Sequence, residues 1–149
     1  MFAGLSAAAG AQTQTQTVNF SVTAINQFSV TSTPVSLTVS AAVAGSDPTP
    51  ATDATSVWAI TTNQTGTKIS ASIPLDMPTG VTLGVLLGQP SGAASTSKNL
   101  ASGAAQDLVT GITKLKASGL AVTYTLSATA AAGVVSGSRV VTYTLTPGT

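Results

Sequence analysis

Residues 120–128 read Leu-Ala-Val-Thr-Tyr-Thr-Leu-Ser-Ala, an alternation of larger apolar side chains with Ala, Thr and Ser. Successive side chains of a β-strand point to opposite faces of the sheet, so this pattern predicts a strand with one buried and one exposed face. Residues 141–145 repeat the same period. If the loop between the two segments is symmetric, they form a hairpin in which Tyr124 lies opposite Tyr143.

The same alternation recurs along most of the chain, between segments rich in Pro, Gly, Asn and Asp that are typical of turns. Residues 100–118 fit either a short helix or a strand, and the two glycines within them favour the strand. Residues 88–97, built mainly of Gly, Ala, Ser and Thr, predict an exposed, mobile loop. The other alternating segments are 18–24, 35–43, 58–60, 69–73 and 81–87, with turns expected at 45–50, 63–66 and 74–80.

About eight short strands with few helical segments predict an all-β fold. Each sheet would have one apolar face that another sheet must cover, which favours an immunoglobulin-like antiparallel β-sandwich with an extended N-terminal arm. We expect the sandwich over residues 25–149 and the arm over residues 1–24. Within the arm, residues 1–11 end in Ala9-x-Ala11 and resemble the end of a secretory signal, which favours export and an extracellular or cell-surface location.

The composition argues against several classes of function. Only 6% of the residues are charged, and the chain has no His or Cys and four acidic residues, all Asp. We therefore expect no enzyme, no cofactor and no metal site. The five Lys and Arg residues are dispersed, so no basic surface is available to bind nucleic acid. No apolar run reaches the roughly 18 residues that would span a membrane.

Few short motifs suggest chemistry. Ser95 and Lys98 match the S-x-x-K pattern of serine acylases, but the companion motifs are missing and the match is interpreted as accidental. The four Asp residues, 47, 53, 76 and 107, form no cluster in the sequence; Asp47 and Asp76 lie at Pro-containing turns, where Asp commonly caps backbone groups, and Asp53 has no feature that points to chemistry.

Three further residues could be ordinary structural residues or could be related to glycans. Asn19 and Asn63 begin glycosylation sequons, and Asn63, in an expected turn, is the better glycan acceptor of the two. Trp58, the one Trp, is interpreted as a core residue instead of a carbohydrate platform.

The most informative segment is residues 12–24, a polar Gln-Thr leader that runs into Val18, Phe20, Val22 and Ala24 at alternating positions. It is either the first strand of its own sandwich or a donor strand that completes the sheet of a neighbour. A surface so poor in charge lacks the usual protection against pairing between sheet edges, which favours donation.

Several segments resemble those of small secreted bacterial β-sandwich proteins and, more distantly, spore-coat-U-like proteins and chaperone–usher pilins. They are Asp53–Asn63, Lys68-Ile-Ser-Ala-Ser-Ile73, Met77-Pro-Thr-Gly-Val-Thr-Leu83, Gly119–Ala128 and Arg139–Leu145. The resemblance implies that the N-terminal extension is a donor strand carried by Val18, Phe20, Val22 and Ala24. The chain departs from the pilins in having no disulfide and in ending Thr146-Pro-Gly-Thr149, so a filament built without an usher is equally compatible.

Taken together, the sequence predicts a structural subunit of an extracellular filament or pilus. Copies of the chain would be each other's partners, joined head-to-tail by donor-strand exchange, with glycans as candidate decorations. The alternative is a monomeric cell-surface module for adhesion or ligand binding.

Overall fold

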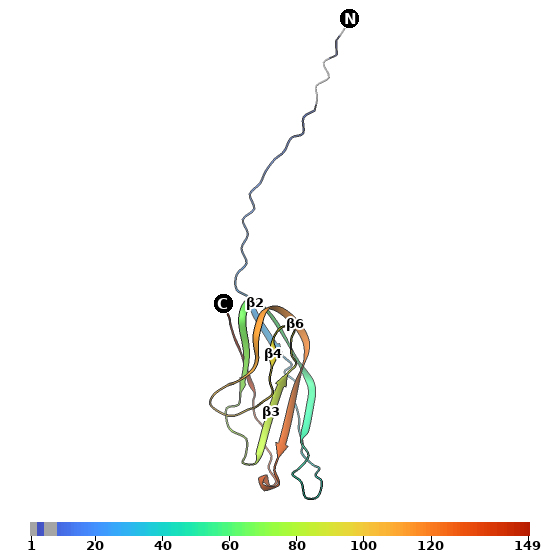
Figure 1. The fold of residues 1–149 in the computed structure, drawn as a ribbon, viewed down its shortest axis with the longest axis vertical. Coiled ribbons are helices and arrows are strands. Elements are labelled where there is room, and N and C mark those ends of the chain that lie inside the picture. The colour runs from blue at the N-terminus through green and yellow to red at the C-terminus, as the bar shows by residue number, and fades with distance from the viewer. Residues whose placement is uncertain (1–2, 5–8) are drawn as a thin grey trace.

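The computed structural model describes residues 3–4 and 9–149. Residues 1–2 and 5–8, which belong to the signal-like stretch 1–11, lie outside the described residues. From residue 9 to residue 25 the chain is extended and exposed, and it projects from one end of a β-sheet body (Figure 1).

The body is a single antiparallel sheet, which confirms the all-β prediction. The sheet order is β1-β2-β6-β3-β5, with β4 also paired to β6 and β7 also paired to β2. A short 3-10 turn, η1, covers Ala130–Ala132, and no helix in the described part of the chain has the length and apolar character to cross a membrane. The strands are β1 (Asn26–Val30), β2 (Ala51–Ser72), β3 (Val81–Leu87), β4 (Ala94–Ser95), β5 (Lys98–Asn99), β6 (Gln106–Ala128) and β7 (Thr142–Thr146).

Two strands are far longer than the sequence pattern suggests. β2 has 22 residues and β6 has 23, and they pair with each other along most of their length. The predicted turn at 63–66 is wrong: the segment lies inside β2, where the register with β6 shifts three times between Thr62 and Ile69. Gly66 has φ 77° there, and Lys114 on β6 has φ 43°, so the ladder bends at bulges instead of ending.

This bend folds the sheet back over its own apolar face. Phe28 of β1 pairs with Ile60, and Tyr143 of β7 pairs with Ala71. A straight strand from Ile60 to Ala71 would be about 36 Å long at about 3.3 Å per residue. The rings of Phe28 and Tyr143 nevertheless have centroids only 6.3 Å apart, so the two halves of β2 must lie on opposite sides of a shared core. Figure 1 shows β2 and β6 arching over at the end that carries the arm.

The core lies between these halves. Trp58 is 1% exposed and packs against Phe28 with ring centroids 6.1 Å apart, which confirms it as a core residue. The other buried apolar residues are Ile60, Ile69, Ala71, Ile73, Leu83, Val85, Leu87, Ala93, Leu100, Leu108, Val109, Ile112 and Val122.

The predicted hairpin between 120–128 and 141–145 is wrong. β7 pairs with β2, and Tyr143 lies opposite Ala71. The hydroxyls of Tyr124 and Tyr143 still meet, 2.7 Å apart, because both side chains point into the core from opposite sides. A period of two identifies the inward face of a strand but not its neighbour in the sheet.

Other expected elements differ as well. Residues 35–43 form no strand: Val35, Leu37 and Val39 are half-buried, and Ala42 makes an isolated β-bridge with Pro48. Residues 88–97 include β4 and the buried Pro90 and Ala93, so they are more ordered than the mobile loop that the composition predicts. The strand expected within 100–118 is confirmed from Gln106 and continues unbroken into 120–128.

The bend gives a stability prediction. Gly66→Ala places a Cβ in open space but forces an L-residue to keep φ 77°, which costs about 1–2 kcal/mol. We expect the free energy of unfolding in urea to fall by about 1 kcal/mol or more. Gly137→Ala is the control, because Gly137 also has room for a Cβ and is not in the left-handed region. Equal stability of the two variants would contradict the role given to Gly66.

Candidate interaction site

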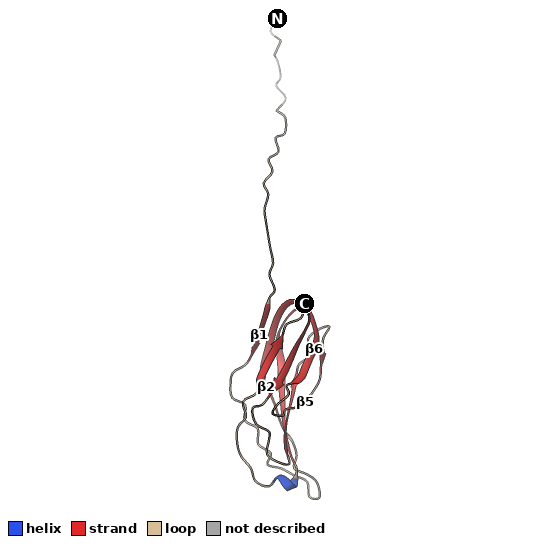
Figure 2. Ribbon diagram, turned by 90° about the vertical axis from the view of Figure 1, so that its left-hand side faces the viewer, coloured by secondary structure: helices blue, strands red, loops and turns tan. Residues whose placement is uncertain are grey.

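The N-terminal arm presents apolar side chains to water. Val18, Phe20 and Val22 are 74%, 92% and 78% exposed, and Ala24 is exposed too. Among the described residues of the arm, none before Thr23 hydrogen-bonds to the body. Figure 2 shows the arm continuing the long axis of the body, so the segment does not act as a strand of its own sheet.

The base of the arm is held by Asn63 of β2. Its Oδ1 accepts a hydrogen bond from the N–H of Ile25 at 2.8 Å, and its Nδ2 donates to the carbonyl oxygen of Thr23 at 2.8 Å. The backbone N–H of Asn63 also donates to the carbonyl oxygen of Ile25 at 3.2 Å. These bonds fix the path of the chain immediately before β1 begins.

Neighbouring side chains brace the same end of the molecule. The Thr62 hydroxyl donates to Asn26 Oδ1 at 2.7 Å, and Asn26 Nδ2 in turn donates to Gln64 Oε1. The C-terminal residue Thr149 exchanges two backbone hydrogen bonds with Thr65, at 2.8 and 3.0 Å. The arm base, the bend of β2 and the C-terminus therefore meet at one end, as Figure 1 also shows.

β7 offers an edge for a further strand. Within the described residues its one partner is β2, so its other side is unpaired. Thr142, Thr144 and Thr146 are exposed, whereas Tyr143 and Leu145 are half-buried against the core. The backbone of residues 32–40 is also unpaired in the described structure, although Leu37 packs against the same core. Unpaired N–H and C=O groups in extended backbone are a template for strand addition.

Tyr143 has the strongest electrostatic perturbation in this region. Burial, followed by the hydrogen bond with Tyr124, raises the pKa of the Tyr143 hydroxyl above its usual range. The neutral phenol is therefore the form that fits the folded protein.

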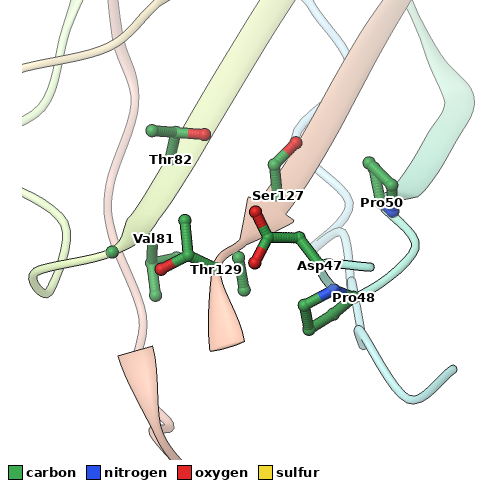
Figure 3. Close-up of a pocket in the computed structure, with 9 residues that line it drawn as sticks. Asp47, Pro48, Pro50, Val81, Thr82, Ser127 and Thr129 are labelled. Atoms are coloured by element: carbon green, nitrogen blue, oxygen red, sulfur yellow. The ribbon is translucent and has the colours of Figure 1, made fainter. Parts of the chain in front are cut away.

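A second surface feature lies at the end opposite the arm. It is an open hollow of about 480 Å³, lined by Asp47, the two prolines near it, and residues at the start of β3 and the end of β6. Figure 3 shows the Asp47 carboxylate and the hydroxyls of Thr82 and Ser127 around it. Asp47 Oδ1 already accepts the backbone N–H of Ala130 at 2.9 Å, so it acts as a loop brace.

The residues of the S-x-x-K match are not joined. Ser95 lies in β4 and pairs with Val109 of β6, whereas Lys98 lies in β5 and pairs with Val85 of β3. The buried Ser95 Oγ has no hydrogen-bond partner among the described residues, so the structure does not connect it to Lys98 Nζ.

The Asp residues act mostly on backbone. Asp53 accepts from Thr55, and Asp76 accepts from the N–H of Ser102 at 2.6 Å, a bond that lowers the Asp76 pKa. Asp107 instead pairs with Lys68 at 3.1 Å. No group of three or more potential metal ligands occurs in the part of the chain that the structure describes.

The two sequons have different surroundings. Asn19 lies in the exposed arm, and Asn63 is half-buried with both ends of its amide hydrogen-bonded. Glycosylation of Asn63 stays a prediction. The sequence reasoning placed Asn63 in a turn and so missed its contact with the arm, because that contact depends on the bend inside β2.

Comparison with protein-family models, with curated proteins and with solved structures finds no match for this chain.

Tyr143 gives a pH prediction. In the unfolded chain its hydroxyl loses a proton near pH 10, while in the folded chain it retains the proton to higher pH. The unfolded state then binds fewer protons, so the contribution of Tyr143 to the free energy of unfolding should be constant below about pH 10 and fall above it. Urea unfolding followed from pH 8 to 11.5 measures this. Tyr143→Phe should weaken the fall, and an unchanged pH dependence would contradict the assignment.

Proposed function

We propose that this protein is a structural subunit of an extracellular filament. In the proposed assembly, the arm of one copy adds as a strand to the open edge of β7 in the next copy. The observation that carries the proposal is that one chain holds both halves of such a contact. The exposed arm has apolar residues at every second position, namely Val18, Phe20 and Val22. The strand β7 has an unpaired edge, and its Tyr143 and Leu145 are only partly buried.

The charge pattern supports pairing between copies. Soluble monomers protect a free sheet edge with Lys, Pro or a bulge. Residues 9–24 of the arm contain no charged side chain, and neither do residues 32–40 nor β7. Pro34 alone interrupts these three segments. The arm and the edge therefore meet without charge repulsion, and little in either segment discourages strand addition.

The free energies involved are large enough for a stable contact. Burial of each of Val18, Phe20 and Val22 contributes about 1.5–3 kcal/mol, or about 5–9 kcal/mol together. Association costs about 4–15 kcal/mol in lost freedom of motion. These two free energies are similar in size. The affinity would therefore depend on the added backbone hydrogen bonds and on the further burial of Leu37, Tyr143 and Leu145.

The proposal includes the finer fold and the location. We infer an immunoglobulin-like sandwich that a neighbour's strand completes, as the resemblance to donor-strand pilins implies. Because the arm and the edge are different surfaces, the contact is head-to-tail and propagates without closing. The signal-like residues 1–11 and the hydroxyl-rich, charge-poor composition support an extracellular site, with no enzymatic role, cofactor or nucleic acid partner.

A pair of charge substitutions tests the donor face. Phe20→Asp should abolish fibres, because a carboxylate would enter the apolar core of the acceptor. Ser21→Asp introduces the same charge at the adjacent position, which points to the opposite face of a strand, and should retain fibres. Negative-stain electron microscopy and analytical ultracentrifugation of the purified proteins measure assembly.

Deletion of residues 1–24 provides the complementary test. Those residues make few contacts with the body, so the truncated protein should fold and remain monomeric. A peptide of residues 12–24 should bind it and raise its unfolding midpoint. A native chain that stays monomeric at high concentration, or a truncated chain that still forms fibres, would contradict strand donation. A stable native monomer would favour the cell-surface adhesion or ligand-binding module.

A further inference from the structure

A subunit with both a donor arm and an acceptor edge faces competition from itself. A segment tethered by a short flexible linker has an effective concentration in the millimolar range at a site on its own chain. Subunits at micromolar concentration would then pair within one copy about a thousand times more readily than between copies, unless geometry prevents it. The following inference rests on the proposed strand donation and concerns what prevents this closure.

The geometry of the arm base supplies an answer. The arm enters β1 next to the C-terminus, where Thr149 bonds to Thr65 and the chain leads back into β7. The arm would therefore have to reverse direction only at residues 23–25 to reach its own β7. Asn63 holds both ends of this segment, through the carbonyl oxygen of Thr23 and the N–H of Ile25.

The Asn63 side chain acts as a substitute peptide group. β1 pairs in regular register with β2 as far as Asn26 opposite Thr62, and the register of β2 with β6 then shifts at the bend. Past that point, the backbone of β2 makes one further bond to the arm base, from the N–H of Asn63 to the carbonyl oxygen of Ile25. The amide of Asn63 presents one acceptor and one donor to the arm, as a backbone peptide would, and so extends the β1–β2 ladder by two residues in a straight line.

We propose that Asn63 is a positioning residue that directs the arm away from its own β7 and so makes strand donation intermolecular. The side chain is half-buried, and the adjacent bonds between Thr62, Asn26 and Gln64 hold the bend from which it projects. Loss of the side-chain amide would remove the bonds to the Thr23 carbonyl oxygen and the Ile25 N–H but not the backbone bond to the Ile25 carbonyl oxygen, so the chain before Ile25 could turn without loss of any apolar contact of the core. Asn63 also begins a glycosylation sequon, and in this proposal its side-chain amide has a structural role.

Disulfide trapping tests this role, because the native chain has no Cys. A double variant carries Ser21→Cys in the arm and Thr144→Cys on the exposed face of β7; Asn19→Cys replaces Ser21→Cys if the register requires it. After mild oxidation at micromolar concentration, non-reducing electrophoresis separates internally bridged monomers from bridged chains. In the otherwise native background we expect bridges between copies. Adding Asn63→Ala should raise the ratio of internal to intermolecular bridges about tenfold, since each hydrogen bond lost changes the equilibrium several-fold.

The matched control is Gln64→Ala, which removes a side-chain bond at the same bend but none to the arm. Asn63→Asp, which retains the acceptor for Ile25 but not the donor for Thr23, should give an intermediate ratio and serves if Asn63→Ala fails to fold. Fluorescence of the buried Trp58 reports folding of each variant. Suppose that the native background forms intermolecular bridges, and that the ratio of internal to intermolecular bridges is the same in Asn63→Ala, Asn63→Asp and Gln64→Ala. That result would overturn the role of Asn63 but not strand donation. Absence of any intermolecular bridge in the native background would instead overturn strand donation itself.

Discussion

The bend shared by β2 and β6 is the constraint on which the rest of the structure depends. A single sheet cannot bury its own apolar face while it stays flat, and the chain solves this by folding its two longest strands over together. The bulges near Gly66 and Lys114 turn both strands without breaking their pairing, so the backbone bonds are largely retained through the corner. Trp58 on one side and Ile69 on the other then belong to the same core.

The bend also determines which strands of the described sheet have an unpaired edge. β1 and β7 pair with the same side of β2, β1 with residues before the corner and β7 with residues after it. Each therefore has an outer edge. In β7 the strand with this edge carries Tyr143 and Leu145, whose side chains are only partly buried in the core. Residues 32–40, which follow β1, contribute Leu37 to that core without entering the sheet. The open edge and the half-buried side chains are thus two consequences of one topology.

How far the sequence predicts this arrangement follows from what alternation encodes. The period of two correctly identified inward side chains, including Trp58, Ile60, Val85 and Tyr124, because burial selects apolar residues at every second position. It misjudged Asn63-Gln-Thr-Gly66, because a bulged corner and a chain-reversing turn use the same residues. The pattern does not show which strands pair, since any strand with one apolar face can pair with any other. It also does not show the contacts of Asn63, because these depend on the bend inside β2. The alternation of residues 18–24 did not distinguish a strand of the chain's own sheet from an exposed arm, because both arrangements use the same pattern.

In the proposed assembly, folding and strand addition would be linked. An isolated copy leaves Leu37, Val141, Tyr143 and Leu145 half-buried, so part of the hydrophobic stabilisation that the sequence offers is unused in the monomer. An added strand would supply both the missing backbone partners of β7 and the missing apolar cover. Its hydrogen bonds would form away from bulk water, where an unpaired group is most costly. In the proposed assembly, an arm that is apolar at every second position, free of charge and held straight at its base would meet each of these needs, whereas an arm that folded back would satisfy them within one copy and stop further addition of subunits. On this argument the direction of the arm matters as much as its side chains.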